Sequence, residues 1–102
     1  MKKILIVVSR YNETNALLLN TVKNLKNNQI KLSVLKVNGA FEIPVVISKN
    51  LKKFDGFIAL GIIIKGRTPN FDFISQAITN GLINLSISSK KPIGNGIITC
   101  LN

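Results

Sequence analysis

Short runs of consecutive apolar residues, rich in β-branched side chains, alternate along this chain with segments of helical periodicity. This alternation restricts the possible folds more than any other feature. The predicted strands are residues 2–9, 32–37, 57–64 and 92–99, of which the first is a short β-branched run and the third is apolar throughout. Apolar runs of this length, bounded by turn residues, are typical of buried strands. The sequence therefore predicts four strands, of which residues 57–64 are apolar on both faces.

Three amphipathic segments separate these strands. The first opens on the cap-rich residues 12–15 and ends at residues 27–28, the second runs from 42 to about 53, and the third is 68–88. Residues that recur every three or four positions place the apolar side chains of a helix on one face. In the third segment these residues are Phe71, Ile74, Ile78, Leu82 and Leu85. We expect three helices, one between each pair of successive strands.

Continuous apolar strands that alternate with amphipathic helices indicate a parallel sheet covered on both faces. With right-handed crossovers, residues 1–102 are expected to form one flavodoxin-like domain, a three-layer α/β/α sandwich around a four-stranded parallel sheet. Such a sheet normally has a further helix after the fourth strand, where this chain ends. We therefore expect that C-terminal helices are missing or that a neighbouring subunit covers the open side.

The composition limits the classes of function. The apolar runs are far shorter than the roughly 20 residues of a membrane helix, and no cleavage site follows the first run, so we expect a cytoplasmic protein without a membrane partner. The single cysteine, Cys100, excludes an internal disulfide and a cysteine-based metal site. The net charge of +10 admits a polyanionic partner. Charge without a recognition motif is weak evidence, however, and we do not expect nucleic acid as a partner.

No histidine occurs in the 102 residues, so no imidazole can move protons near neutral pH. The side-chain carboxylates are those of Glu13, Glu42, Asp55 and Asp72. Any acid–base chemistry must therefore use these carboxylates, a substrate group or water.

Ligands of open α/β sheets bind at the carboxyl ends of the strands. Tyr11 follows the first strand and either shields the start of the helix or stacks on a planar ligand. Residues 39–44, Gly-Ala-Phe-Glu-Ile-Pro, follow the second strand and combine small residues with an aromatic ring and a carboxylate. Glu42 either gains stability from the helix dipole or accepts hydrogen bonds from a ligand. Both functional interpretations place a small organic ligand at this edge.

Residues 65–69, Lys-Gly-Arg-Thr-Pro, precede the third helix. Thr68 as N-cap and Pro69 in the first turn would explain how the helix begins. The free backbone N–H groups of a helix start, together with Lys65 and Arg67, also suit an anion. The spacing of a Walker phosphate loop is absent, so these residues are a helix cap, an anion site or both.

Four segments, residues 9–13, 39–44, 59–73 and 92–99, resemble the 6,7-dimethyl-8-ribityllumazine synthase family in order and spacing, and Gly-Ala-Phe-Glu-Ile-Pro is the most specific of them. Members of that family are flavodoxin-like transferases. They condense 5-amino-6-(D-ribitylamino)uracil with 3,4-dihydroxy-2-butanone 4-phosphate in the penultimate step of riboflavin biosynthesis. The resemblance implies no metal and no organic cofactor, a homopentamer with sites between adjacent subunits, and riboflavin synthase as a pathway partner.

The resemblance also implies roles for particular residues. Those that would contact the ribitylaminouracil are Tyr11, Ala40, Phe41, Glu42, Ile62, Ile63, Ile64 and, from the neighbouring subunit, Asn95. Arg67 and Thr68 would hold the phosphate of the butanone. Asn70 occupies the position of the family's histidine, the proposed proton donor, and is the candidate catalytic position.

Three departures from the family pattern bear on activity. Asn70 cannot titrate, Asn95 stands where many members have phenylalanine, and the chain ends before the family's last helices, which carry a basic residue for the phosphate. Because proton transfer from a positioned side chain contributes about 10²–10⁴-fold to a rate, we expect reduced activity. One alternative is an impaired relative that only binds ribityl-pyrimidine or flavin. A more distant one is a basic flavodoxin-like module that binds nucleic acid.

Overall fold

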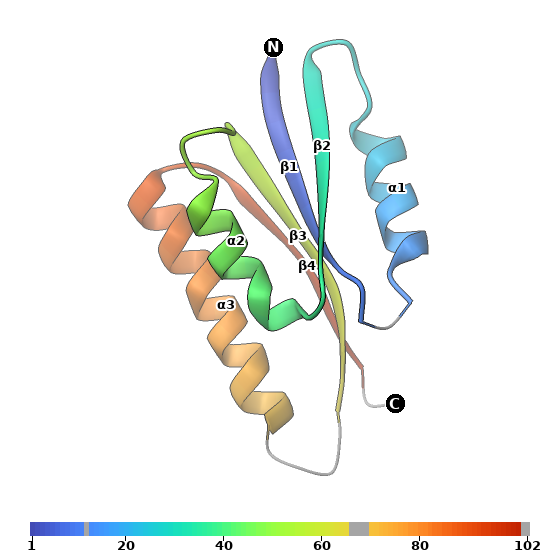
Figure 1. The fold of residues 1–102 in the computed structure, drawn as a ribbon, viewed down its shortest axis with the longest axis vertical. Coiled ribbons are helices and arrows are strands. Elements are labelled where there is room, and N and C mark those ends of the chain that lie inside the picture. The colour runs from blue at the N-terminus through green and yellow to red at the C-terminus, as the bar shows by residue number, and fades with distance from the viewer. Residues whose placement is uncertain (12, 66–69, 101–102) are drawn as a thin grey trace.

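The computed structural model describes residues 1–11, 13–65 and 70–100 and shows a four-stranded sheet flanked by helices (Figure 1). In chain order the elements are β1 (Lys2–Ser9), α1 (Asn15–Leu25), β2 (Ile30–Val37), the 3₁₀ turn η1 (Ala40–Glu42), α2 (Ile43–Lys49), β3 (Gly56–Ile64), α3 (Asn70–Ser89) and β4 (Ile93–Cys100). The predicted alternation of four strands with three helices is confirmed.

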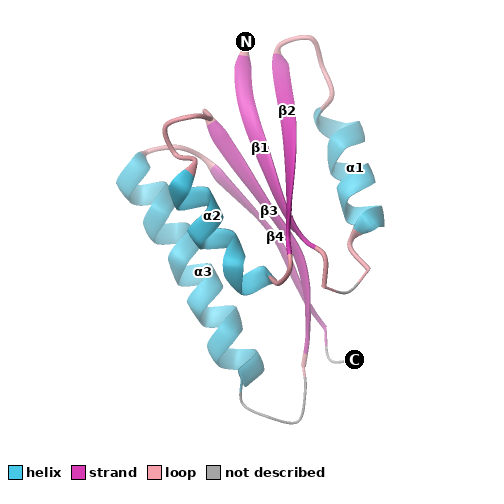
Figure 2. Ribbon diagram, viewed as in Figure 1, coloured by secondary structure: helices cyan, strands magenta, loops and turns pink. Residues whose placement is uncertain are grey.

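All four strands run parallel, in the order β2-β1-β3-β4. Figure 2 shows α1 on one face of the sheet and α2 and α3 on the other. The predicted flavodoxin-like α/β/α sandwich is therefore confirmed. We call the edge at which the strands end (Ser9, Val37, Ile64 and Cys100) the carboxyl edge, and the edge at which they begin (Lys2, Ile30, Gly56 and Ile93) the amino edge. Each helix begins at the carboxyl edge and ends at the amino edge (Figure 1).

The larger core lies between the sheet and the two helices α2 and α3. Its fully buried members are Leu5, Val7, Val37, Ala40, Ile43, Ile47, Phe57, Ala59, Ile78 and Leu82. Burial of apolar surface at roughly 25 cal/mol per Å² is the main force that holds such layers together. Ile78 and Leu82 belong to the apolar face predicted for the third helix, and Ile74 and Leu85 pack at its margin.

A smaller core lies on the opposite face, where Leu18 and Val22 of α1 pack against Ile6, Val8 and Leu60. Side chains alternate between the two faces of a strand, so the register places the β3 and β4 residues Ile64 and Ile98 on this α1 face as well. Their side chains are 45% and 41% exposed. The open side that the sequence predicted therefore lies over the β3–β4 half of this face.

The second helix is shorter than the sequence predicts, and the prediction of a single helix from residue 42 to about 53 was wrong. Residues 40–42 form a 3₁₀ turn, and α2 ends at Lys49. The Asn50 side-chain Nδ2 donates a hydrogen bond of 2.7 Å to the carbonyl of Val46. An asparagine side chain that bonds to the backbone competes with helix continuation, and the chain turns at residues 51–53 instead.

Other boundaries shift by a few residues. α1 ends at Leu25 because Lys26 is extended, ahead of the predicted stop at residues 27–28. β2 begins at Ile30, since Ile30 and Lys31 pair with Lys2 and Lys3 of β1. β4 covers Ile93–Cys100 in place of residues 92–99, and α3 extends to Ser89. The predicted start of α3 at Thr68 lies outside the described residues.

The loop between α2 and β3 is held by a lysine from beyond α3. The Lys91 ammonium donates to the carbonyls of Leu51 and Phe54, the latter at 2.8 Å. Lys91→Met retains the side-chain stem but leaves both half-buried carbonyls without their donor. We expect the free energy of unfolding to fall by about 1–3 kcal/mol, as measured by equilibrium urea denaturation. Lys90→Met at the exposed neighbouring position should stay within about 0.5 kcal/mol of the parent, and equal losses in both variants would contradict this role.

Candidate functional site

The carboxyl edge brings three of the four predicted ligand segments together. β1 lies between β2 and β3 in the sheet, so the loop after β1, the turn after β2 and the end of β3 are neighbours. The register pairs Ser9 with Val37 and Val8 with Leu60. Tyr11, the turn Ala40–Glu42 and the strand end at residues 62–64 therefore belong to one edge of one chain.

Tyr11, in the loop after β1, has a hydrogen-bonded backbone N–H and an exposed ring. The Tyr11 N–H lies 3.1 Å from the Asn38 carbonyl and 3.2 Å from Ser9 Oγ. Thr14 is the N-cap residue of α1, yet its Oγ1 donates to the Ser9 carbonyl at 2.6 Å and makes no capping hydrogen bond. These bonds bind the loop to the ends of β1 and β2, while the Tyr11 side chain is 72% exposed. A ring that shielded the helix start would be buried, so its exposure favours the ligand-stacking interpretation.

The turn η1 places a buried small residue next to two exposed ones. Ala40 is buried, whereas the Phe41 side chain is 60% exposed and Glu42 is exposed. The Asn38 N–H donates to Glu42 Oε2 at 3.4 Å, a long contact that leaves the carboxylate accessible. Glu42 is also the N-cap residue of α2 but makes no side-chain capping bond. The turn therefore presents an aromatic ring and a carboxylate to solvent at the sheet edge.

Gly61 explains how this turn approaches the sheet so closely. A Cβ at Gly61 would lie 3.3 Å from the Ala40 Cβ and 3.5 Å from the Ser9 Cβ. A contact of 3.3 Å is tight, so a side chain in β3 at this point would press against the turn. The glycine at position 61 thus lets η1 and the loop after β1 meet over β3.

The end of β3 extends beyond its neighbour β1. Pairing with β1 stops at Leu60, and residues 61–64 pair with β4 alone. The ladder to β4 continues past the strand, since the Lys65 N–H donates to the Cys100 carbonyl at 2.8 Å. The backbone of residues 62–64 thus lies at the carboxyl edge next to the loop after β1, an arrangement that fits the predicted role of these residues in reading a planar ligand.

Asn95 is not part of this cluster. It pairs with Ala59 in the middle of β4, and its Oδ1 accepts a hydrogen bond of 2.9 Å from the Ile97 N–H. By the register it is level with Val7, two residues before the end of β1, and β3 lies between the two strands. Asn95 lies instead in a groove of about 370 Å³ between α3 and β4. The expected contact of Asn95 with a ligand of the neighbouring subunit stays a prediction.

The remaining predicted positions are described only in part. Arg67 and Thr68 lie outside the described residues. Asn70 is the first residue of α3, at the carboxyl edge, but its side chain is not described. Asp72 in the first turn of α3 is exposed. The described part of the candidate site thus consists of Tyr11, the turn η1 and the end of β3, and the predicted phosphate-binding role of Arg67 and Thr68 stays a prediction from sequence.

A pocket of about 170 Å³ beside Tyr11 was not foreseen from the sequence. Among the residues that line it are Arg10, Glu13, Thr14 and Lys36. The sequence signal was available, because Arg10 precedes Tyr11 and Lys36 is the penultimate residue of β2. It was missed because only the pairing of β1 with β2 brings the two cations together. The pocket adds two positive charges and a carboxylate to the carboxyl edge.

Two further features bear on the class of site. Among the described residues, no three histidine, cysteine, aspartate or glutamate side chains come close enough to hold a metal ion. No helix in the described part of the chain is long and apolar enough to cross a membrane.

These features define a class, the flavodoxin-like α/β proteins with a small-ligand edge at the ends of the strands. The model of the 6,7-dimethyl-8-ribityllumazine synthase family matches residues 1–102. The chain therefore belongs to that family.

Individual relatives agree with this assignment. The 6,7-dimethyl-8-ribityllumazine synthase of Corynebacterium kroppenstedtii is 37% identical over 100 residues, which is 96% of this chain and 63% of the relative. The enzyme of the same name from Buchnera aphidicola subsp. Baizongia pistaciae is 42% identical over 109 residues, with 99% of this chain and 69% of the relative covered. That of Cutibacterium acnes is 44% identical over 68 residues, 67% of this chain and 41% of the relative. The chain thus spans about two thirds or less of the length of these relatives.

Proposed function

We propose that this chain acts as a 6,7-dimethyl-8-ribityllumazine synthase. It condenses 5-amino-6-(D-ribitylamino)uracil with 3,4-dihydroxy-2-butanone 4-phosphate in the penultimate step of riboflavin biosynthesis, in the cytoplasm. The proposal rests mainly on one observation, that the exposed Tyr11 ring, the exposed Phe41 ring and the exposed Glu42 carboxylate all lie at the carboxyl edge of one sheet. The family match over the whole chain supports it.

The proposed chemistry needs little from the protein besides position. The amine of the uracil attacks the ketone, water leaves as the imine forms, phosphate is eliminated, and ring closure releases a second water. Holding two reactants in reactive geometry replaces a bimolecular step with an effectively unimolecular one. Tyr11 and Phe41 hold the pyrimidine, Glu42 accepts from ribityl hydroxyls, and the backbone of residues 62–64 reads the uracil edge. No metal or organic cofactor takes part.

The position of Asn95 supports a site shared between subunits. Asn95 lines the groove between α3 and β4 and is not part of the cluster formed by Tyr11, Phe41 and Glu42, so we expect it to contact the uracil from a neighbouring copy. We propose a homopentamer of this kind, with riboflavin synthase as the enzyme that consumes the product.

The decisive experiment mixes the purified protein with both substrates and follows lumazine fluorescence. A rate above the uncatalysed one supports the proposal. The absence of histidine from the chain favours a second candidate, a relative that binds ribityl-pyrimidine or flavin without turnover. Tight binding of the ribityl-pyrimidine with no rate above background would establish that second function.

Phe41 offers a test of the pyrimidine cradle. Phe41→Ala removes an exposed ring, so it should leave folding intact while weakening ribityl-pyrimidine binding about ten- to hundredfold, as expected for a lost stacking contact of about 1–3 kcal/mol. Titration calorimetry measures the change. Leu19→Ala removes an apolar side chain from α1 that is 71% exposed, and this variant should bind as the parent does. An unchanged dissociation constant in Phe41→Ala would remove Phe41 from the site.

Arg67 offers a test of the phosphate segment. A guanidinium beside a threonine at a helix start suits phosphate, and hydrogen bonds to charged groups contribute about 1.5–3 kcal/mol. Arg67→Ala should therefore raise the apparent KM for the butanone phosphate by about 10–100-fold. Lys36→Ala removes one positive charge from the same edge and should change that KM by less than about threefold. Equal effects in the two variants would point to the general charge of the edge and not to Arg67.

A further inference from the structure

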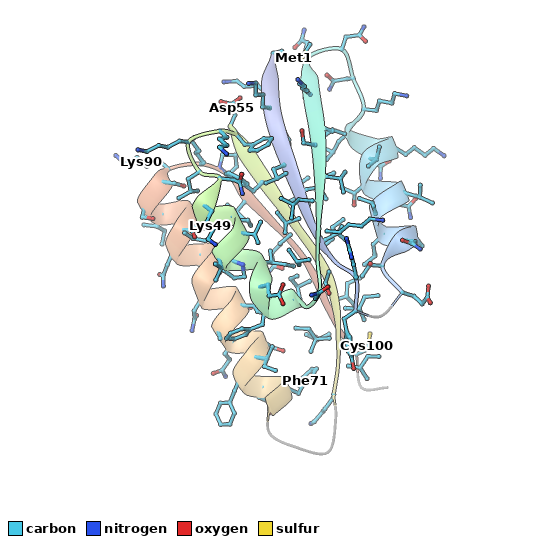
Figure 3. All side chains as sticks on the ribbon, viewed as in Figure 1. Met1, Lys49, Asp55, Phe71, Lys90 and Cys100 are labelled. Atoms are coloured by element: carbon cyan, nitrogen blue, oxygen red, sulfur yellow. The ribbon has the colours of Figure 1, made fainter. Side chains whose placement is uncertain are left out.

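The positive charge of this protein is concentrated at the amino edge. Ten of its 14 lysines and arginines lie at the starts of strands, at the ends of helices or in the loops that join them: Lys2, Lys3, Lys23, Lys26, Lys31, Lys49, Lys52, Lys53, Lys90 and Lys91. All but Lys91 are exposed. We call this set the amino-edge lysines. Figure 3 shows Met1, Asp55 and Lys90 toward the same end of the molecule.

The opposite edge is nearly balanced. Arg10, Lys36 and Lys65 lie there, and Arg67 falls outside the described residues. Three of the four side-chain carboxylates, Glu13, Glu42 and Asp72, lie beside the helix starts at that edge. At the amino edge, Asp55 is the one side-chain carboxylate beside ten lysines. The net charge of +10 is therefore a property of one face and not of the whole surface.

Helix dipoles account for part of this asymmetry. Lysines near helix ends, such as Lys23 in α1 and Lys49 in α2, are stabilised by the negative end of the dipole. The lysines at the strand starts have no such partner. Lys3 and Lys31 are direct neighbours in the register of β1 and β2, and like charges opposite each other on adjacent strands are destabilising. Repulsion of this kind is relieved when an anion lies across the face.

The carboxyl group of Asp55 is affected by the positive charge of the amino edge. Its Oδ2 accepts a hydrogen bond of 2.8 Å from the Lys3 N–H. This hydrogen bond, with smaller contributions from the charges of Lys2, Lys91 and Lys3, lowers the pKa of the Asp55 carboxyl. The single carboxylate at the amino edge is thus held in its charged form by its surroundings and still leaves the face strongly positive.

We propose that the amino edge binds the phosphate backbone of double-stranded nucleic acid without sequence preference. Lysine ammonium groups contact phosphates as point charges. When they neutralise the phosphates, the nucleic acid releases its condensed counterions, and this release supplies most of the free energy of non-specific binding. The amides of Asn24, Asn27 and Gln29, all exposed beside the lysines, add groups that hydrogen-bond to phosphate and sugar oxygens. The site lies at the end of the sheet opposite the proposed synthase site and is independent of it.

The side chains at this face favour a duplex over other polyanions. Single strands are bound through aromatic rings on which bases stack, and Phe54, the aromatic residue nearest in sequence to this edge, packs edge-on against Phe57 in the core. Anionic membranes are bound by basic faces that also insert aromatic or aliphatic anchors. The amino-edge lysines are interspersed mainly with amides and hydroxyls, and the exposed Met1 is one apolar side chain among them, a composition that suits a hydrophilic groove of a duplex.

The test measures fluorescence anisotropy of labelled 20-base-pair DNA and RNA duplexes with the whole chain between 20 and 200 mM NaCl. We expect a dissociation constant of about 10⁻⁴–10⁻⁶ M near physiological salt, and a log–log salt slope of about −4.5 for about five phosphate contacts. The double variant Lys3→Gln/Lys31→Gln should bind the duplexes about tenfold or more weakly at 0.1 M salt. Its salt slope should be less negative than that of the parent by about 2, because two phosphate contacts are lost. Because it removes a repulsive pair, this variant should be at least as stable as the parent, so unfolding cannot mimic the loss.

Lys36→Gln/Lys65→Gln has the same net charge and is the matched control. Binding and slope close to those of the parent in this control, with the loss in Lys3→Gln/Lys31→Gln, would support the proposal. Equal losses in the two variants would overturn it, because total charge and not the amino edge would then decide. The absence of salt-dependent duplex binding would also overturn it. Tighter binding to vesicles containing 30% phosphatidylserine than to either duplex at the same salt would show that the face serves a membrane instead.

Discussion

Asn70→His is expected to raise the rate of lumazine formation by about 10²-fold or more. The parent chain has no histidine, and a positioned general acid contributes about 10²–10⁴-fold to a rate. Asn70 is the first residue of α3 at the carboxyl edge, on the same edge as Tyr11 and Phe41. An imidazole with a pKa near 6.5 can supply a proton there, whereas an amide can only hydrogen-bond.

The pH dependence separates proton transfer from an improved fit. If histidine acts as a proton donor, its gain is full below a pH of about 6.5 and declines as the pH rises through that value. The comparison uses kcat from lumazine fluorescence between pH 5.5 and 8.5. Asn80→His introduces the same side chain at an exposed position further along α3 and should leave the rate unchanged. A gain that does not depend on pH, or one of equal size in Asn80→His, would argue against a missing proton donor as the defect.

Phe57→Ala is expected to lower the free energy of unfolding by about 3–5 kcal/mol. The Phe57 side chain is 2% exposed, and it lies in the core between the sheet and the helices α2 and α3. Its ring packs edge-on against Phe54 with a centroid separation of 6.0 Å. Truncation to alanine loses the free energy of burying the ring and the contact with Phe54, and it leaves a cavity whose lining residues lose their packing partner. Domains of this size are stable by about 5–15 kcal/mol, so this one change removes a large share of the total.

Equilibrium urea denaturation measures the loss of stability. Phe73→Ala is the matched control, because the same ring is removed from a side chain that is 66% exposed, and its effect should stay within about 0.5 kcal/mol. A loss below about 1 kcal/mol in Phe57→Ala would mean that the core relaxes to fill the space. A similar loss in Phe73→Ala would mean that its exposed ring is packed in solution, as in an assembly of several copies.

The elements of the fold could be predicted because their signals are local. The run Phe57–Ile64 is apolar on both faces, and such a run is stable only inside a covered parallel sheet. The boundaries that shifted depend on side-chain contacts with the backbone. Asn50 ends α2 through its bond to the Val46 carbonyl, and no periodicity in the sequence reveals that competition.

The candidate site was predicted as separate segments and was joined by the strand order. Residues 39–44 are distinctive in sequence, whereas the sequence leaves open whether Tyr11 shields the start of the helix or contacts a ligand. The placement of β1 between β2 and β3 put both at one edge, and the 72% exposure of Tyr11 then favoured the ligand. The same topology placed Asn95 in the groove between α3 and β4 and outside this cluster, which the sequence could not reveal because it depends on how the strands pair.

The sequence by itself determined the class of fold, the family and the chemical character of the ligand edge, because apolar periodicity and short motifs are written in neighbouring residues. The tertiary structure alone decided where the charge lies. The lysines are dispersed along the sequence with no run longer than two, so composition could report only their sum. In a parallel α/β sandwich every strand start and every helix end falls at the same edge, and that geometry gathers ten lysines from distant segments onto one face.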